Sequence, residues 1–229
     1  HDVGRYPILN GQAYAAHSRV GQHSEGNTTV PFYYYPATVD AYNFKSQMPV
    51  EECGNMLLMV AAMGYADGNW DMAKEDLDIF RMWSEYLINY GEDPGEQLCT
   101  DDFAGHLAHN CNLSLKAICA LGAFAQMLYD SQEAAHYHSL AKSMALRWEA
   151  EALDGDHYKL AFDQDGTWSM KYNIIWDKLL GLNLFDESVC EEEVEVYLSE
   201  LNPYGVPLDS RNTYTKLDWM AWTTVMTDR

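Results

Sequence analysis

LSLKAICALGAFAQML, residues 113–128, is the stretch that decides the fold. Its apolar residues recur at steps of three and four, the spacing of one face of an α-helix. Asp130-Ser131 breaks the pattern, and a second apolar series at the same spacing continues to about residue 153. Two helices joined by so short a break predict an antiparallel helical hairpin.

The rest of the chain repeats this arrangement. One pair of helices is predicted before the central hairpin and further helices after it, at residues 50–64, 70–90, 174–184, 191–201 and from 215 onward. Asp-Gly turns around residues 154–166 allow at most a small β-hairpin near Tyr158 to Phe162. The sequence therefore predicts an all-α protein of antiparallel helical hairpins with long loops, and its order is compatible with part of an (α/α) toroid.

Residues 1–48 differ from the rest of the chain in composition. Together with Pro49 they contain four prolines, and they include the aromatic run Phe32-Tyr33-Tyr34-Tyr35. They show no sustained periodicity, which predicts an irregular loop region packed on the helices. The 229-residue length fits a single domain, 1–229. The abrupt ends lead us to expect a segment of a longer enzyme.

The charge of the chain excludes several functions. Fourteen Lys and Arg against 35 Asp and Glu give a formal charge of -21, which opposes binding to nucleic acid or to an anionic membrane surface. The sequence contains no run of about 18 apolar residues, so it predicts no membrane-spanning helix. The five cysteines lack the spacing of a zinc site. An acidic, lysine-poor surface suits a protein that works at high ionic strength or outside the cell, and the expected location is extracellular or secreted, although a merely solvated acidic face explains the charge equally well.

Polar residues concentrate in the four loops that precede alternate helices, at residues 48–55, 97–110, 166–178 and 204–216. In a toroid these loops meet at one end of the inner ring. Asp101 and Asp102 are adjacent carboxylates that repel each other and lose solvation when covered, so they predict a site, although an acidic helix cap explains them equally well. Glu51 and Glu52 have a similar alternative, because acids in a first helical turn stabilise the helix dipole.

Two other loop features suggest ligand contacts. Arg211 lies in a Pro- and Gly-containing loop of a chain that has few cations, and its guanidinium can bind a substrate carboxylate through two parallel hydrogen bonds. His106 and His109 share a face if they are helical, but no third ligand is recognisable, so a hydrogen-bonding role is favoured over metal binding. We therefore predict no metal site, and allow only a structural calcium ion.

Five motifs in order resemble the fungal-type glutaminase A family. They are HDVGRYP at 1–7, MPVEECGNM at 48–56, QLCTDDFAGHLAHN at 97–110, KYNIIWDKLLGLNLF at 171–185 and LDSRNTYTKLDW at 208–219. The resemblance implies a helical toroid of the six-hairpin glycosidase type and hydrolysis of L-glutamine to glutamate and ammonia. It also implies that the remaining domains of the same precursor are partners of this segment, and that the substrate is a small molecule.

Amide hydrolysis needs an activated water, a donor for the oxyanion and an acid for the leaving ammonia. Our hypothesis assigns Asp101 or Asp102 as general base and Glu52 as its acid partner. Lys171 and Tyr172 serve as oxyanion or substrate donors, and Arg211 binds the α-carboxylate. Further substrate contacts are expected from Asp209, Asn173 and His106. No cofactor is required.

Two other functions remain open at this point. In a glycoside hydrolase of the six-hairpin type, paired carboxylates flank a sugar bond and Trp168, Trp176 and the tyrosines stack on sugar rings. In a non-catalytic binding module, the acidic loops hold a cation or a partner. Release of ammonia from glutamine, release of reducing sugar, or binding without turnover distinguishes the three.

Overall fold

The structure is a computed structural model that describes residues 14–15, 19–25, 28–34 and 47–227. Within residues 19–34 and at Asp102 it describes the backbone only. Most of the expected loop region at residues 1–48 therefore lies outside the described residues.

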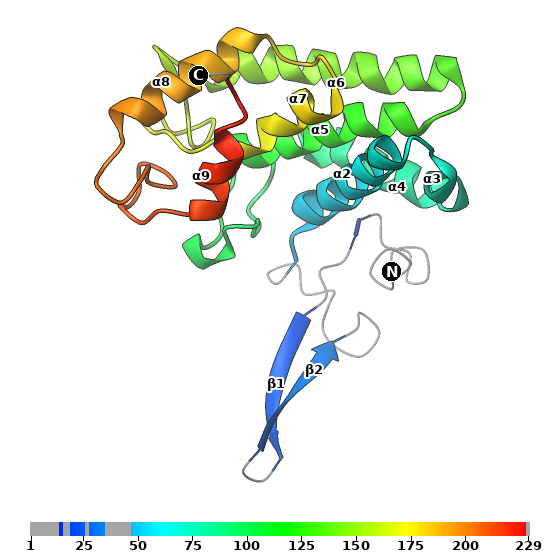
Figure 1. Cartoon of the computed structure of the whole chain (residues 1–229), viewed down its shortest axis with the longest axis horizontal. Coiled ribbons are helices and arrows are strands. Elements are labelled where there is room, and N and C mark those ends of the chain that lie inside the picture. Colours follow the sequence, from blue (N-terminus) through cyan, green and yellow to red (C-terminus); the bar gives the residue numbers. More distant parts are fainter. Residues whose placement is uncertain (1–13, 16–18, 26–27, 35–46, 228–229) are drawn as a thin grey trace.

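Helix α5 (Cys111–Met127) is the centre of the molecule, and almost all of its residues are buried. It begins at Asn110, whose side chain accepts a hydrogen bond from the Leu113 amide at 3.1 Å and so caps the helix. Figure 1 shows α5 between α6 (Ser131–Ala152) on one side and α2 (Pro49–Asp67) with α4 (Leu77–Tyr90) on the other. A helix covered on all sides can be apolar around its whole circumference, as the sequence of α5 is.

The α2 helix is longer than its sequence predicts. We expected it to end near Gly64, but it continues to Asp67 and ends at Gly68, which has a φ of 66°. Gly64 instead allows close packing, because a Cβ there would lie 2.2 Å from the Trp70 ring. The expected helix at residues 70–90 is interrupted, since α3 (Asp71–Glu75) ends at Asp76 before α4 begins.

Shorter elements make up the rest of the described helical region. The small β-hairpin is present but lies upstream of its expected position, with β3 (Leu153–Asp154) paired to β4 (His157–Tyr158). The remaining elements are two 3-10 turns and three helices: η2 (Asp102–Ala104), η3 (Tyr172–Ile174), α7 (Ile175–Leu180), α8 (Glu187–Ser199) and α9 (Leu217–Thr223).

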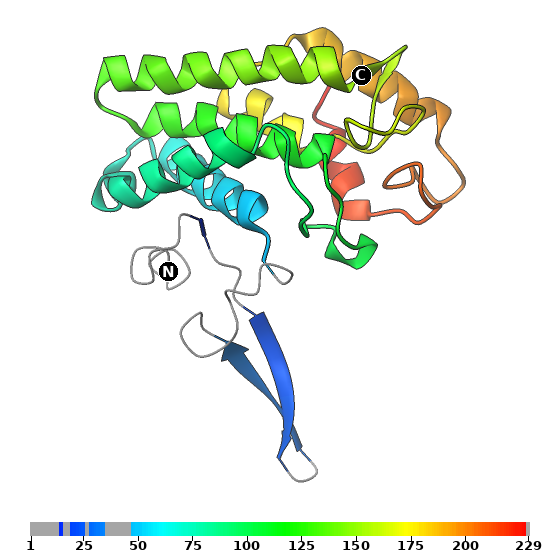
Figure 2. The same cartoon turned by 180° about the vertical axis from the view of Figure 1, so that it is seen from behind.

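The prediction of purely irregular backbone at residues 1–48 is wrong for one segment. β1 (Arg19–Glu25) and β2 (Thr28–Tyr34) form an antiparallel hairpin that extends away from the helices in both views (Figures 1 and 2). The β2 sequence TTVPFYY is rich in β-branched and aromatic residues, which favour strands. Pro31 is tolerated because a two-stranded ribbon leaves one side of each strand without a ladder partner.

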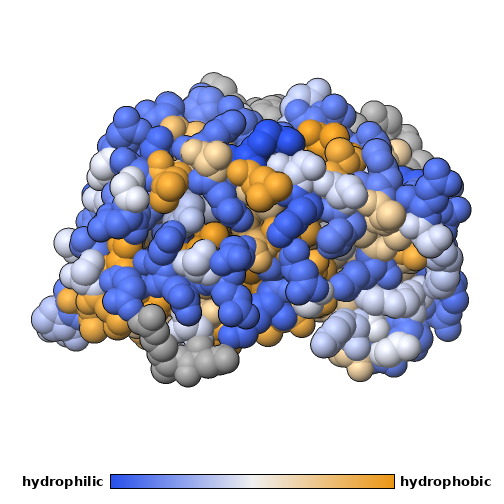
Figure 3. Space-filling model, turned by 90° about the horizontal axis from the view of Figure 1, so that it is seen from above, coloured by the Kyte–Doolittle hydropathy of each residue, from blue (hydrophilic) through white to orange (hydrophobic). Residues whose placement is uncertain are grey.

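The predicted all-α class is confirmed, since the sheets in the described part of the chain are two isolated two-stranded hairpins. No helix in the described ranges is long and apolar enough to cross a bilayer. The face shown in Figure 3 is largely hydrophilic, with hydrophobic residues scattered singly or in small groups. This distribution agrees with the high negative charge of the chain.

Phe124 tests the role of α5 as the core helix. Its ring is fully buried and meets Tyr137 of α6 edge to face, with the ring centroids 4.9 Å apart. We expect Phe124→Ala to lower the free energy of unfolding by about 3–5 kcal/mol, because it removes apolar contact and leaves a cavity. Leu146→Ala, at an exposed position of α6, should cost about 0.5 kcal/mol or less in the same urea titration. Equal losses would contradict this packing.

Candidate active site

Three polar loops meet at the N-terminal end of α5. Isolated β-bridges join Ser169 to Asp209 across two of these loops and Asn110 to Ala161 beyond β4, and a bridge between Gln97 and Leu107 closes the 97–110 loop on itself. The Met170 amide also donates to the Leu208 carbonyl at 2.9 Å. Figures 1 and 2 show the η2 loop beside α9 on the same side of the molecule. Segments far apart in the sequence are thus fastened around one space.

A narrow pocket opens between these loops. Its volume of about 20 Å³ holds about one water molecule. The 97–110, 166–173 and 204–216 segments supply most of its wall, which consists of Cys99, Asp101, Gly105, Leu107, Asn110, Asn112, Leu160, Ser169, Met170, Tyr172, Leu208, Asp209 and Arg211. Three of the four loops selected from the sequence therefore share one pocket.

Asp101 is the carboxylate at the centre of this wall, and only 7% of it is exposed. One oxygen accepts a hydrogen bond from the Tyr172 hydroxyl at 2.7 Å, and the other accepts from the Trp219 indole N–H at 2.9 Å. The Tyr172 and Trp219 rings stack on each other with centroids 4.1 Å apart. Burial, together with the nearby Asp101 charge, raises the pKa of Tyr172 well above its ordinary value, so Tyr172 remains a donor.

The 204–216 segment supplies the second carboxylate and the only cation among the described lining residues. Asp209 accepts from the Arg211 backbone amide at 2.9 Å, from Nε at 3.0 Å and from a terminal guanidinium nitrogen at 2.7 Å. These hydrogen bonds raise the pKa of Arg211. Asp209 is buried and Arg211 is partly exposed, so the guanidinium is oriented from behind while its outer edge remains accessible.

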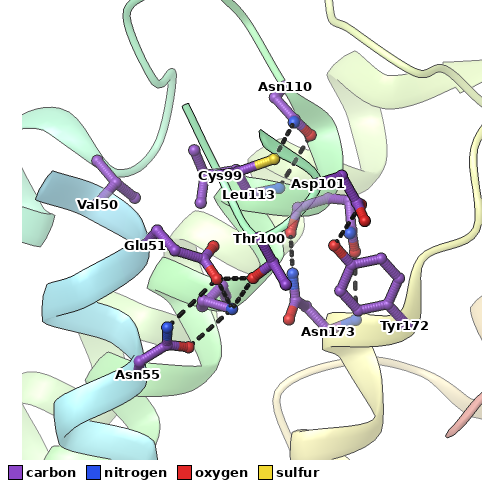
Figure 4. Close-up of polar contacts among 12 residues, drawn as sticks. Val50, Glu51, Asn55, Cys99, Thr100, Asp101, Asn110, Leu113, Tyr172 and Asn173 are labelled. Carbon is purple, nitrogen blue, oxygen red and sulfur yellow. Dashed lines mark hydrogen bonds and ion pairs between the residues drawn. The ribbon is translucent and has the colours of Figure 1, made fainter. Parts of the chain in front are cut away.

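A buried ion pair supports the loop that carries Asp101, and Figure 4 shows its Glu51 next to Thr100. Glu51 of α2 and Lys116 of α5 are both almost fully buried and form a salt bridge. The same Glu51 oxygen accepts from the hydroxyl of Thr100, and Lys116 also donates to Asn55 at 2.8 Å. Thr100 precedes Asp101, so this network fixes the backbone that carries the pocket carboxylate.

Lys171 lies behind the wall and does not present its ammonium to the pocket. Its Nζ is fully buried and donates to the Tyr158 carbonyl at 2.9 Å and to the Ser169 carbonyl and hydroxyl at 3.0 and 3.1 Å. The Glu193 carboxylate is 3.8 Å away. Burial raises the pKa of Glu193, although the Lys171 charge opposes that rise.

The other predicted residues differ in position. Asn173 donates to the backbone and side chain of Asn112, at 2.9 and 3.2 Å, and so supports a lining residue from behind. Glu52 is half buried on α2 and His106 is exposed on the 97–110 loop, and neither lines the pocket. The side chain of Asp102 lies outside the described part of the structure.

Sequence reasoning missed several residues of this region. Lys116 had a visible signal, because a single cation inside an apolar helix needs a buried partner. Trp219 and Ser169 had none, since their contacts depend on how distant loops meet. Cys99 also lines the pocket, and burial raises the pKa of its thiol to about 12, so it is a neutral thiol rather than a thiolate.

Ion binding finds little support within the described ranges. No group of three His, Cys, Asp or Glu side chains there is arranged to hold a metal ion. The five cysteines are all free thiols. The described pocket wall therefore combines two carboxylates, Asp101 and Asp209, with the Arg211 guanidinium and neutral groups.

The whole chain matches a known protein family. The model of the glutaminase A six helical-hairpin domain matches residues 1–229. The chain belongs to the glutaminase A family. It is 34% identical over 228 residues to glutaminase A of Aspergillus oryzae, covering 96% of this chain and 31% of that protein. It is 27% identical over 238 residues to a probable glutaminase of Arthroderma benhamiae, covering 85% of this chain and 27% of that protein.

The chain thus spans about a third of the length of these glutaminase relatives. The match to the six helical-hairpin domain agrees with the helical hairpins seen here. The pocket at the end of α5 is therefore a feature of a glutaminase A hairpin domain.

The Glu51–Lys116 pair yields a stability prediction. Lys116→Met leaves a buried carboxylate without its cation, so we expect the free energy of unfolding to fall by about 3–5 kcal/mol. The double variant Glu51→Gln with Lys116→Met should recover most of this loss. Arg147→Met, which breaks the exposed pair with Glu92, should cost less than about 1 kcal/mol in the same urea titration. Similar losses for both single variants would contradict the buried pairing.

Proposed function

We propose that this pocket serves the hydrolysis of the side-chain amide of L-glutamine to glutamate and ammonia. The names of the two relatives support this reaction. The observation that carries the proposal is Asp101, a buried carboxylate held in the pocket by two neutral donors and free of a cationic partner among the described residues. Such a carboxylate can exchange protons with a bound water, whereas Asp209 is neutralised by Arg211.

In the proposed reaction one water occupies the pocket next to Asp101. Asp101 takes a proton from this water, whose oxygen forms a bond to the amide carbon while the carbonyl oxygen gains negative charge. The C–N bond then breaks, the carbonyl re-forms, and Asp101 returns the proton to the leaving nitrogen. One carboxyl group thereby acts first as base and then as acid, and Glu52 is not needed for either step.

Arg211 is the proposed anchor for the substrate. Asp209 binds Nε and one terminal nitrogen, which leaves the outer edge of the guanidinium for the α-carboxylate of glutamine. A substrate held at this end places its side-chain amide at the mouth of the pocket, next to the water beside Asp101. The scheme uses water and no cofactor.

The glycoside hydrolase alternative finds less support in this geometry. The described pocket wall contains two carboxylates, and Arg211 binds both oxygens of one of them. The Tyr172 and Trp219 rings stack on each other, so each has one face already covered. A pair of free carboxylates flanking a sugar is therefore not present among the described lining residues.

Asp101→Asn tests the proposed base. The amide keeps the shape and can still accept from Trp219, but it cannot take a proton, so kcat for ammonia release should fall roughly 100- to 10,000-fold. The assay is enzyme-coupled detection of ammonia with the full-length native protein. Asp218→Asn, at an exposed position of α9, is the matched control. A kcat near that of the wild type would reject Asp101 as base, and an equal loss in Asp102→Asn alone would move the role to Asp102.

Arg211→Lys tests the proposed anchor. Lysine keeps the charge but loses the two-point contact, so KM for glutamine should rise at least roughly tenfold, with a smaller change in kcat. Glutaminamide, which lacks the α-carboxylate, should be a poor substrate for the wild type and should be little affected by the substitution. Arg81→Lys, in a partly exposed ion pair outside the pocket wall, is the control. An equal rise in KM for glutamine and for glutaminamide would show that Arg211 does not bind the α-carboxylate.

A further inference from the structure

Ser169 is a pocket residue to which the scheme above gives no role. It lines the pocket, is almost fully buried, and pairs with Asp209 across a β-bridge. Residues paired in this way direct their side chains to the same face, so the Ser169 hydroxyl lies beside the carboxylate that orients Arg211. It is thus placed in the pocket wall next to the proposed substrate anchor.

The hydroxyl receives a hydrogen bond and retains a proton to give. Lys171 Nζ donates to Ser169 Oγ at 3.1 Å. Among the described residues nothing accepts the hydroxyl proton of Ser169 in return. An ammonium that donates to a hydroxyl draws electron density from its oxygen and makes its proton a stronger donor.

The same contacts argue against Ser169 as a nucleophile. To activate a serine, Lys171 would have to be a neutral amine with a free lone pair. Its three protons instead match three acceptors, at 2.9, 3.0 and 3.1 Å, and a buried carboxylate lies 3.8 Å away. Loss of one proton would leave a buried carbonyl without its donor and Glu193 without its cation.

The oxyanion needs a donor that Tyr172 does not supply, because the proton of the Tyr172 hydroxyl is directed to Asp101. We propose that Ser169 donates its hydroxyl proton in a hydrogen bond to the amide carbonyl oxygen as negative charge develops there, and that Lys171 is the positioning residue that orients and polarises Ser169. This inference rests on the proposed glutaminase reaction. It gives Lys171 an indirect part in the site, with no covalent step at Ser169.

The test compares Ser169→Ala with Ser143→Ala in the full-length native protein. Ser143 is an exposed serine of α6, far from the pocket in sequence and bonded only within its own helix. Loss of one oxyanion donor should lower kcat roughly 100- to 1,000-fold. KM for glutamine should stay close to the wild-type value, because the contact is made mainly in the transition state. Ser143→Ala should leave both constants unchanged.

Two further measurements separate this role from others. The urea midpoint of Ser169→Ala should fall, because the buried Lys171 ammonium loses one of its three acceptors. Binding of a phosphinic analogue of the tetrahedral intermediate should weaken in step with kcat, while binding of glutamate does not. Equal weakening of both ligands would indicate a structural role and overturn the proposal. A γ-glutamyl ester on Ser169, detected by mass spectrometry of enzyme quenched during turnover, would overturn it in favour of a nucleophile.

The outcome for activity also distinguishes the two proposals. An active wild type with an unchanged Ser169→Ala variant overturns the role of Ser169 and leaves the glutaminase reaction standing. A full-length wild type that releases no ammonia from glutamine overturns the proposed function and the role of Ser169 with it.

Discussion

The burial of one ammonium group, that of Lys116, constrains both the helix packing and the pocket. Lys116 lies on the central helix α5, and its charge requires a buried partner, which α2 supplies as Glu51. The stem of Lys116 must pass close to α2, and a Cβ at Gly54 would lie 2.6 Å from the Lys116 Cγ. Glycine at this position therefore permits the ion pair, and the ion pair holds Thr100 and the loop that carries Asp101.

The helices and the pocket differ in how far the sequence determines them. The periodicity of 113–128 and its neighbours is local information, so it predicts the existence and type of the main helices. Their ends are less predictable, because Gly64 is required by the Trp70 ring rather than by a turn. The sequence did not predict the β1–β2 hairpin, because the prolines and glycines of this region indicate a loop more strongly than the β-branched and aromatic residues of β2 indicate a strand.

The pocket was predictable as a set of loops but not as a set of contacts. Alternation of polar loops with helices identifies 97–110, 166–178 and 204–216, and three loops do share one wall. Which side chain faces the pocket depends on β-bridges between residues 40 or more positions apart, such as Ser169 with Asp209. For this reason Lys171 is buried behind the wall, Trp219 reaches Asp101, and the charged partner on α2 is Glu51 rather than Glu52.

The two buried lysines have a common electrostatic consequence. The chain carries 14 cations against 35 acids, so its overall field repels anions such as an amino-acid carboxylate. Salt screens that field within about 10 Å, whereas buried charges are screened much less. Lys116 behind the Asp101 loop and Lys171 behind Ser169 each have a buried carboxylate nearby, so neither wall is strongly positive. The accessible edge of Arg211 is then the main local attraction for an anion, and Asp209 orients that single group through two hydrogen bonds to its inner edge.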